Sequence, residues 1–375
     1  MTRTEALQHF YENDVEESSN QTLLALDEFY HEHREELLPG FLESMGRICQ
    51  KVLLLQKKES KGKIGFIHYS MLRTAIATQS YRYLMEAYDG SWYLDTSECL
   101  ADYDASWAFT FLDQLGKELE QQRRVYLNRV IAADVKKIIL QQAEKFNCYV
   151  VKLIRYGMNQ AVLLQEFQEI AKETEFEVRV GEYFDLSEIV YKQDIREKNA
   201  RTVKRLLETK LDDEYAYEVL QRLDLSNGRY DGVDVRYADL RGSNLSGAAL
   251  SESVLVGTRF AEGFLDNVDL SRAVIYEADF SGSKLRGALL RETEGAGGLP
   301  KGNWQRPGFE GVNFSGADLE GADLTGANLR GADFRGANLS RVNFEGASLE
   351  GARFLKGEFK SIGLDEEQSA LVVWE

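Results

Sequence analysis

The C-terminal part of the chain has a five-residue period. From Leu225 onward an apolar residue recurs at every fifth position, and the pattern resumes in a shifted frame at Phe309. A period of five matches neither the helical turn of about 3.6 residues nor the two-residue alternation of a strand. It matches a chain that turns a corner every five residues, so we expect a coil with four sides per turn. The central positions are Leu225, Tyr230, Val235, Leu240, Leu245, Leu250, Leu255, Phe260, Leu265, Leu270, Ile275, Phe280, Leu285 and Leu290, then Phe309, Phe314, Leu319, Leu324, Leu329, Phe334, Leu339, Phe344, Leu349, Phe354, Phe359 and Leu364.

A second series of small residues supports the coil. The segment from Phe314 to Leu339 reads FSGADLEGADLTGANLRGADFRGANL, with Ala two positions before the central residue and Gly two positions after it. In a narrow interior a small side chain must face each large one, and Gly suits tight corners. We therefore predict that the central residue and the preceding Ala both point inward.

These residues resemble the pentapeptide-repeat family over about 140 residues. The resemblance implies a right-handed quadrilateral β-helix, a solenoid, over residues 223–364, and partner binding rather than chemistry. Arg229, Arg259 and Lys284 stand where the family prefers Asp or Asn, which affects the surface and not the fold.

The repeat is interrupted over residues 291–308, a segment rich in Gly and Pro. Loops that leave a rigid scaffold often carry recognition residues, and Trp304 between Lys301 and Arg306 has the composition of a binding hot spot. We predict that these three residues bind a partner. The alternative is that the loop folds back and Trp304 packs on the coil.

The two open ends of the coil need covers. At the C-terminal end, residues 365–375 include the apolar run Leu371, Val372, Val373 and Trp374, which either covers the last coil or pairs with the same tail of a second chain. Because members of the family commonly dimerise through this end, the resemblance favours a homodimer. At the other end, residues 201–222 have the spacing of an amphipathic linker helix that covers the first coil.

Residues 1–200 predict a mostly helical α+β domain whose family is not recognised. We expect a helix that ends near Pro39, followed by another helix. Residues 63–72 and 176–184 predict strands, and residues 80–95 predict a hairpin that turns at Asp89-Gly90. A long helical stretch is expected over residues 104–172. The chain is therefore expected to be multidomain.

Aromatic residues gather on the predicted hairpin. Alternation places Tyr81 and Tyr83 on one face of the sheet and Arg82 on the other. Together with Trp92, the two tyrosines form a candidate surface for a peptide or a small ligand. The alternative is that these rings pack against the long helices.

No catalytic, cofactor or metal site is predicted, because the sequence contains no recognisable catalytic motif. His31 and His33 are two residues apart on a helix and face different directions, which makes them a poor metal pair. His68 is the candidate acid–base residue, with a structural histidine as the alternative. Acidic neighbours are expected to raise the pKa of the Cys99 thiol and to discourage nucleophilic use.

Composition bounds the function. A net charge of −17 argues against direct binding to nucleic acid. The sequence shows no long apolar membrane segment or export signal, and the three cysteines are widely spaced, which favours the cytoplasm. The leading interpretation is a protein–protein interaction or scaffold protein with an unidentified protein partner. The alternatives are a DNA-mimicking protein that binds and protects type II topoisomerases, and an enzyme or accessory subunit with its site in residues 1–200.

Overall fold

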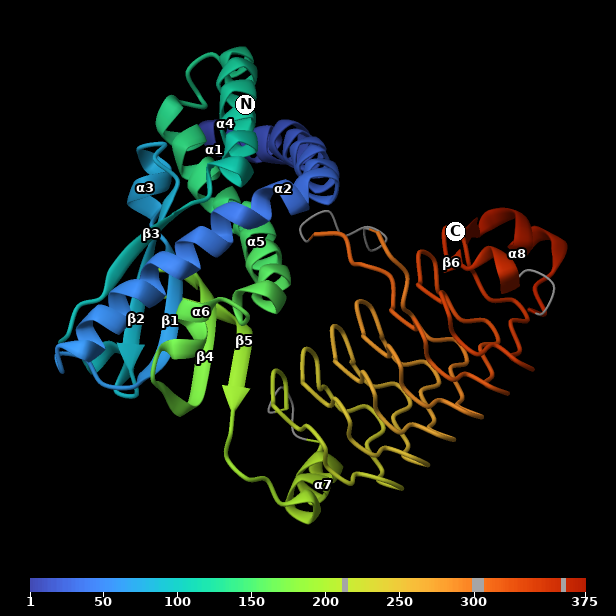
Figure 1. Ribbon diagram of the computed structural model, residues 1–375. Coiled ribbons are helices and arrows are strands. Elements are labelled where there is room, and N and C mark those ends of the chain that lie inside the picture. Colours follow the sequence, from blue (N-terminus) through green and yellow to red (C-terminus); the bar gives the residue numbers. More distant parts are fainter. Residues whose placement is uncertain (211–214, 299–306, 359–361) are drawn as a thin grey trace. The chain divides into compact units, whose positions relative to one another are not determined.

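The computed structural model describes residues 1–210, 215–298, 307–358 and 362–375. It divides into two compact units (Figure 1). The first contains residues 1–195, and the second contains residues 196–298 and 308–375.

Helices make up most of the first unit. They are α1 (Arg3–Phe10), α2 (Glu16–Lys57), α3 (Arg73–Ala77), α4 (Ser106–Gln122), α5 (Ala132–Ala161) and α6 (Gln165–Glu169), with a π-helical turn at Tyr11–Val15 and 3-10 turns at Trp92–Leu94 (η2) and Arg123–Tyr126.

The predicted helix end near Pro39 is wrong, because α2 continues through this proline. Leu38 and Phe41 on either side are buried, and α5 approaches them at Gly157. A Cβ at Gly157 would lie 2.5 Å from the Phe41 ring. Burial of two large side chains at this contact offsets the cost of a proline inside a helix, about 3 kcal/mol.

The first unit also contains a five-stranded sheet with strand order β3-β2-β1-β4-β5. β1 pairs parallel with β4, and the other neighbours are antiparallel. Buried residues from alternate positions of the strands join those of the helices in one core. The strands are β1 (Ile64–Met71), β2 (Arg82–Asp89), β3 (Leu100–Asp104), β4 (Lys172–Glu182) and β5 (Ser187–Asp194).

The expected hairpin over residues 80–95 is only half correct. β2 ends at Asp89, but the following residues form η2, and the next strand begins at Leu100. The Asp95 carboxylate holds this detour in place: it accepts hydrogen bonds from the backbone N–H groups of Asp89 and Ser97, both at 2.8 Å. The Lys61 ammonium pairs with the same carboxylate at 2.6 Å, and both side chains are buried.

The second unit is the expected four-sided β-helix. Bridges join residues 20 positions apart, such as Val219 with Asp239, so four five-residue repeats complete one coil. The repeat begins one five-residue unit earlier than predicted, because Leu220 is already buried in the core of the coil. Inside the coil, rings stack along one column, with centroid separations from 4.8 to 5.2 Å between Phe260, Phe280, Phe314, Phe334 and Phe354.

Short elements cover the two ends of the coil. Helix α7 (Ala200–Thr209) packs Val203 and Leu207 onto the first coil and is shorter than the predicted helix. At the other end, α8 (Glu366–Leu371) precedes β7 (Val373–Trp374), which pairs parallel with β6 (Arg353–Phe354). The tail therefore covers the last coil of its own chain.

Candidate interaction surfaces

One wall of the solenoid carries an apolar strip. The bridges form four ladders, one for each wall, which start at Val219, Asp224, Arg229 and Asp234. The wall that starts at Asp234 is called the fourth wall. Its ladder continues through Val254, Val274, Glu294, Asn328 and Ser348. The apolar strip consists of Val254 and Val274, which are bridge partners, and of Tyr237, Val256 and Tyr276 at the corner positions beside them; all five are partly exposed.

Ring contacts give the strip a fixed shape. Tyr237 stacks on Tyr217 with 5.3 Å between ring centroids, and Tyr276 stacks on Phe309 at 4.6 Å. The Tyr237 ring also lies against the backbone at Gly257, where a Cβ would be 2.3 Å from the ring. Phe309 and Gly298 exchange two backbone hydrogen bonds, 2.8 and 3.0 Å, where the chain leaves and rejoins the coil. The apolar strip thus ends beside the base of the predicted recognition loop.

Several arginines on the walls form ion pairs with neighbouring carboxylates. Guanidinium groups pair with carboxylates for Arg241 and Asp239, Arg286 and Asp318, Arg291 and Asp323, and Arg335 and Asp333, at 2.5 to 2.6 Å. Burial alone would raise the pKa of Asp239, but hydrogen bonding to Arg241 and the nearby Arg259 lower it below its usual value. Arginines therefore interrupt the acidic residues, and these walls carry alternating charge.

The predicted loop residues Lys301, Trp304 and Arg306 lie outside the residues that the structure describes. Their role in partner binding stays a prediction.

The four apolar residues of the C-terminal tail divide into two pairs. Val372 is buried, and Trp374 packs on Phe354 with 5.5 Å between ring centroids. Leu371 and Val373 are 48% and 43% exposed. The first pair forms the cover of the last coil, and the second pair is left on the surface, where it could serve the predicted homodimer.

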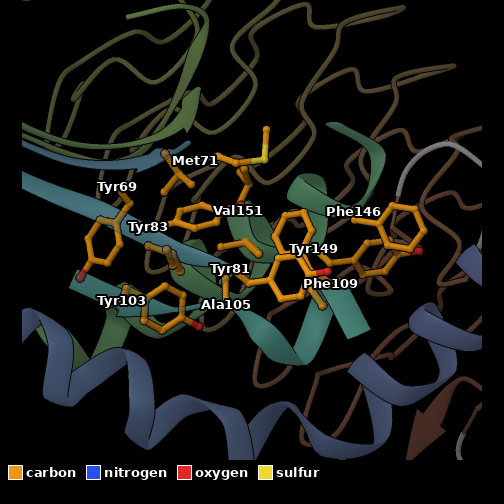
Figure 2. Packing of buried hydrophobic residues seen from close by; sticks show 14 of the residues in the cluster. Tyr69, Met71, Tyr81, Tyr83, Tyr103, Ala105, Phe109, Phe146, Tyr149 and Val151 are labelled. Carbon is orange, nitrogen blue, oxygen red and sulfur yellow. The ribbon is translucent and has the colours of Figure 1, made fainter. Parts of the chain in front are cut away.

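Tyr81 and Tyr83 are not surface residues (Figure 2). Tyr81 stacks on Phe109 of α4 at 5.4 Å, and the Tyr83 hydroxyl donates to Asn147 Oδ1 of α5 at 2.7 Å. Their proposed role in partner binding is not supported, because the sheet face that carries them is packed under helices. Arg82 lies on the other face, as predicted, and is exposed.

Trp92 belongs to that other face, because η2 brings it across the sheet onto Phe66, with 3.9 Å between ring centroids. Beneath it lies a row of ionisable residues that the sequence did not reveal: His68 pairs with Glu86 of β2 and with Arg179 of β4 in the registers of the sheet. Burial, and to a lesser extent Arg179, lower the pKa of His68 to about 4. Burial raises the pKa of Glu86.

The enzyme alternative expects a deep pocket with a perturbed His68 or carboxylate; the pKa shifts of His68 and Glu86 agree with one part of this expectation, and the pocket stays a prediction. At neutral pH His68 is uncharged and able to take part in hydrogen bonding. Within the described residues, no cluster of His, Cys, Asp and Glu is placed to hold a metal ion. No helix in the described part of the chain has the length and apolar character needed to cross a membrane.

Comparison with known families agrees with the geometry of the coil. A family model described as pentapeptide repeats matches in 8 copies, over residues 220–257, 253–291, 309–341 and 317–354. The C-terminal part of this chain is a pentapeptide-repeat domain. No matched segment of this model lies in the first unit.

Several solved structures resemble the pentapeptide-repeat domain. QnrB1, described as a plasmid-mediated fluoroquinolone resistance protein, is 18% identical, with 43% of this chain and 85% of that chain covered and a TM-score of 0.29. HetL, involved in heterocyst differentiation regulation in the cyanobacterium Nostoc sp. strain PCC 7120, is 20% identical, with 42% and 97% covered and a TM-score of 0.18. Rfr23 from the cyanobacterium Cyanothece 51142 is 23% identical, with 46% and 99% covered and a TM-score of 0.18. No curated protein matches the chain.

Proposed function

We propose that this protein is a scaffold that holds a protein partner on the fourth wall of its pentapeptide-repeat domain. The observation that carries the proposal is the apolar strip. At the wall positions of Val254 and Val274, other repeats of this chain have polar residues such as Asn244, Asp279 and Asn313. Clustered apolar side chains with aromatic neighbours are a common feature of protein interfaces.

The pairing of charges supports protein binding over DNA mimicry. A protein that imitates DNA needs a long, continuous negative surface, because the phosphate backbone presents one. In this solenoid guanidinium groups such as those of Arg286 and Arg335 lie between the carboxylates and pair with them. Protection of a type II topoisomerase remains an alternative, and recovery of a topoisomerase subunit in the experiment below would favour it.

Affinity capture from the host lysate tests the proposal. The bait is the full chain, compared with a double variant, Val254→Asn with Val274→Asn. Asparagine fits this wall position, because Asn328 already occupies it in a later coil. The control is Leu289→Asn, a single apolar-to-asparagine substitution at the equivalent position of the neighbouring wall.

We expect one protein to be recovered with the wild-type chain and with Leu289→Asn, and its yield to fall at least about tenfold with the double variant, which corresponds to roughly 1.4 kcal/mol. Equal recovery with all three baits would show that the fourth wall is not the docking surface.

The segment that interrupts the repeat, residues 291–308, is the second element of the proposal. We predict that Trp304→Ala reduces recovery of the same partner, because truncating a tryptophan at a binding hot spot commonly costs about 2 kcal/mol or more. Undiminished recovery would favour the alternative in which Trp304 packs on its own coil.

A further inference from the structure

The second face of the sheet in the first unit combines buried polar groups with exposed rings. His68 is only 3% exposed, yet its Nε2 atom has no hydrogen-bond partner among the described residues. The indole Nε1 of Trp92 is also buried and has no partner there. The two rings are 5.3 Å apart between centroids. Leaving a buried polar group unpaired costs about 1–3 kcal/mol, so two neighbouring ones mark a place where a ligand would restore hydrogen bonds.

The rings of Trp92 and Tyr93 contact the His68 ring, at 5.3 and 5.9 Å between centroids. Asp95 fixes one end of the segment Trp92–Leu94 through Lys61 and two backbone N–H groups. Trp92 itself has a φ of 55°, in the left-handed region, which costs roughly 1–2 kcal/mol for a residue with a side chain. A ligand that lifts the indole from the sheet and lets Trp92 leave the left-handed region would recover part of this energy.

Exposed apolar side chains continue from His68 through Tyr93. Tyr93 contacts His68 and Phe184, with 5.9 and 5.0 Å between ring centroids. Tyr93 is 44% exposed and Phe184 is 63% exposed. Leu94 and Leu186, beside them in the chain, are more than four-fifths exposed, at 82% and 83%. We call Tyr93, Leu94, Phe184 and Leu186 the ring patch.

The charges around the nitrogens disfavour a charged ligand. The Arg179 guanidinium lies 5.3 Å from the centre of the Trp92 ring and opposes an ammonium group. Its N–H groups already bind Glu177 at 2.7 Å and Ser187 at 3.0 Å. Arg179 and Lys192 already pair with Glu177, at 2.7 and 3.7 Å, which weakens their attraction for a carboxylate ligand. A neutral peptide group can bond to both nitrogens. Its C=O accepts a hydrogen bond from the Trp92 indole N–H. Toward His68 Nε2, the peptide C=O accepts if this nitrogen is protonated, and the peptide N–H donates if it is not.

We propose that this face binds an extended peptide segment of a partner protein, with a backbone amide against His68 and Trp92 and an apolar side chain on the ring patch. This inference rests on the proposed scaffold function and gives the first unit a separate recognition role. It depends on residues and measurements that the fourth wall does not share, so either proposal can fail alone.

The test uses N-acetyl-phenylalaninamide, a neutral peptide mimic with one ring. The full chain is labelled with ¹⁵N-tryptophan, which gives one indole signal for each of the 4 tryptophans. Titration should shift the Trp92 indole signal with a midpoint on the order of 10 mM, as expected for so small a ligand. 3-Phenylpropionate has a carboxylate and no amide. At the same concentration it should shift the Trp92 indole signal at least about fivefold less than the amide probe does.

Two variants separate recognition from folding. Trp92→Phe keeps an aromatic ring but removes the donor, and should weaken binding of the probe, followed on the probe's own signals, about fivefold. The control is Trp107→Phe, since the Trp107 indole already donates to the Tyr103 hydroxyl at 3.0 Å on the helix-covered face. It should leave binding unchanged.

An unshifted Trp92 signal, an equal response to 3-phenylpropionate, or equal probe binding by the two folded variants would each overturn the proposal.

Discussion

At the residue scale, the contact between α2 and α5 depends on the absence of a side chain at Gly157. A Cβ there would lie 2.5 Å from Phe41 and 2.8 Å from Leu38, so Gly157→Ala forces these side chains to shift. We expect Gly157→Ala to lower the free energy of unfolding of the first unit, measured in urea, by about 1–3 kcal/mol.

Gly116→Ala is the matched control, because its nearest neighbour, Ile139, is 3.6 Å away. This substitution should be neutral or slightly stabilising, since Ala favours a helix more than Gly does. Equal effects of the two substitutions would show that α2 and α5 do not approach each other here.

His68 gives stability a pH dependence. Its pKa is lowered to about 4 in the folded protein, against about 6.5 in the unfolded chain. Between these values the unfolded chain binds the extra proton, so this contribution to stability is present above pH 6.5 and is lost as the pH falls toward 4. The loss is up to about 3 kcal/mol. The free energy of unfolding, measured in urea from pH 7 to 4, should fall more steeply for the wild type than for His68→Gln. Parallel curves for the two proteins would show that the pKa of His68 is not lowered by folding.

At the element scale, the C-terminal cover relies on one amide. The Gln368 side chain donates to the backbone carbonyls of Phe344 and Ala347, at 2.8 and 3.0 Å, and is buried. Gln368→Ala should lower the free energy of unfolding of the solenoid by about 1–3 kcal/mol in urea, because the Ala347 carbonyl loses this buried donor and the Phe344 carbonyl keeps, among the described residues, only its bond from the Ala347 N–H.

Glu367→Ala, on the exposed side of the same helix, should change stability by less than about 0.5 kcal/mol. If Gln368→Ala were equally mild, the tail would not cover the last coil in the way described.

Elements differ in how far the sequence determines them. The five-residue period predicted the solenoid because each repeat packs against its neighbours, and local pattern and tertiary contact coincide. The first unit is different. Its helix persists through Pro39 and its hairpin opens at η2 because distant residues, Gly157 and Lys61, supply the deciding contacts. The row of His68 and Arg179 was missed for the same reason, since β1 and β4 are about 110 residues apart.

At the scale of the whole molecule, the surface pair Leu371 and Val373 tests the predicted homodimer. Light scattering of the wild type should give twice the chain mass of 42.6 kDa. Leu371→Asp with Val373→Asp should give a monomer, because charges at an apolar contact weaken association. A monomeric wild type at all accessible concentrations would end the homodimer prediction.

Site-specific photo-crosslinking in host cells shows whether a partner protein docks on the fourth wall. Tyr276→p-benzoylphenylalanine places the reactive group in the apolar strip. Ser271→p-benzoylphenylalanine places it at the equivalent corner of the neighbouring wall in the same coil, five residues earlier in the repeat. We expect one discrete protein adduct at position 276 and little adduct at position 271. Equal adducts at both positions, or an adduct at 271 alone, would contradict docking on the fourth wall.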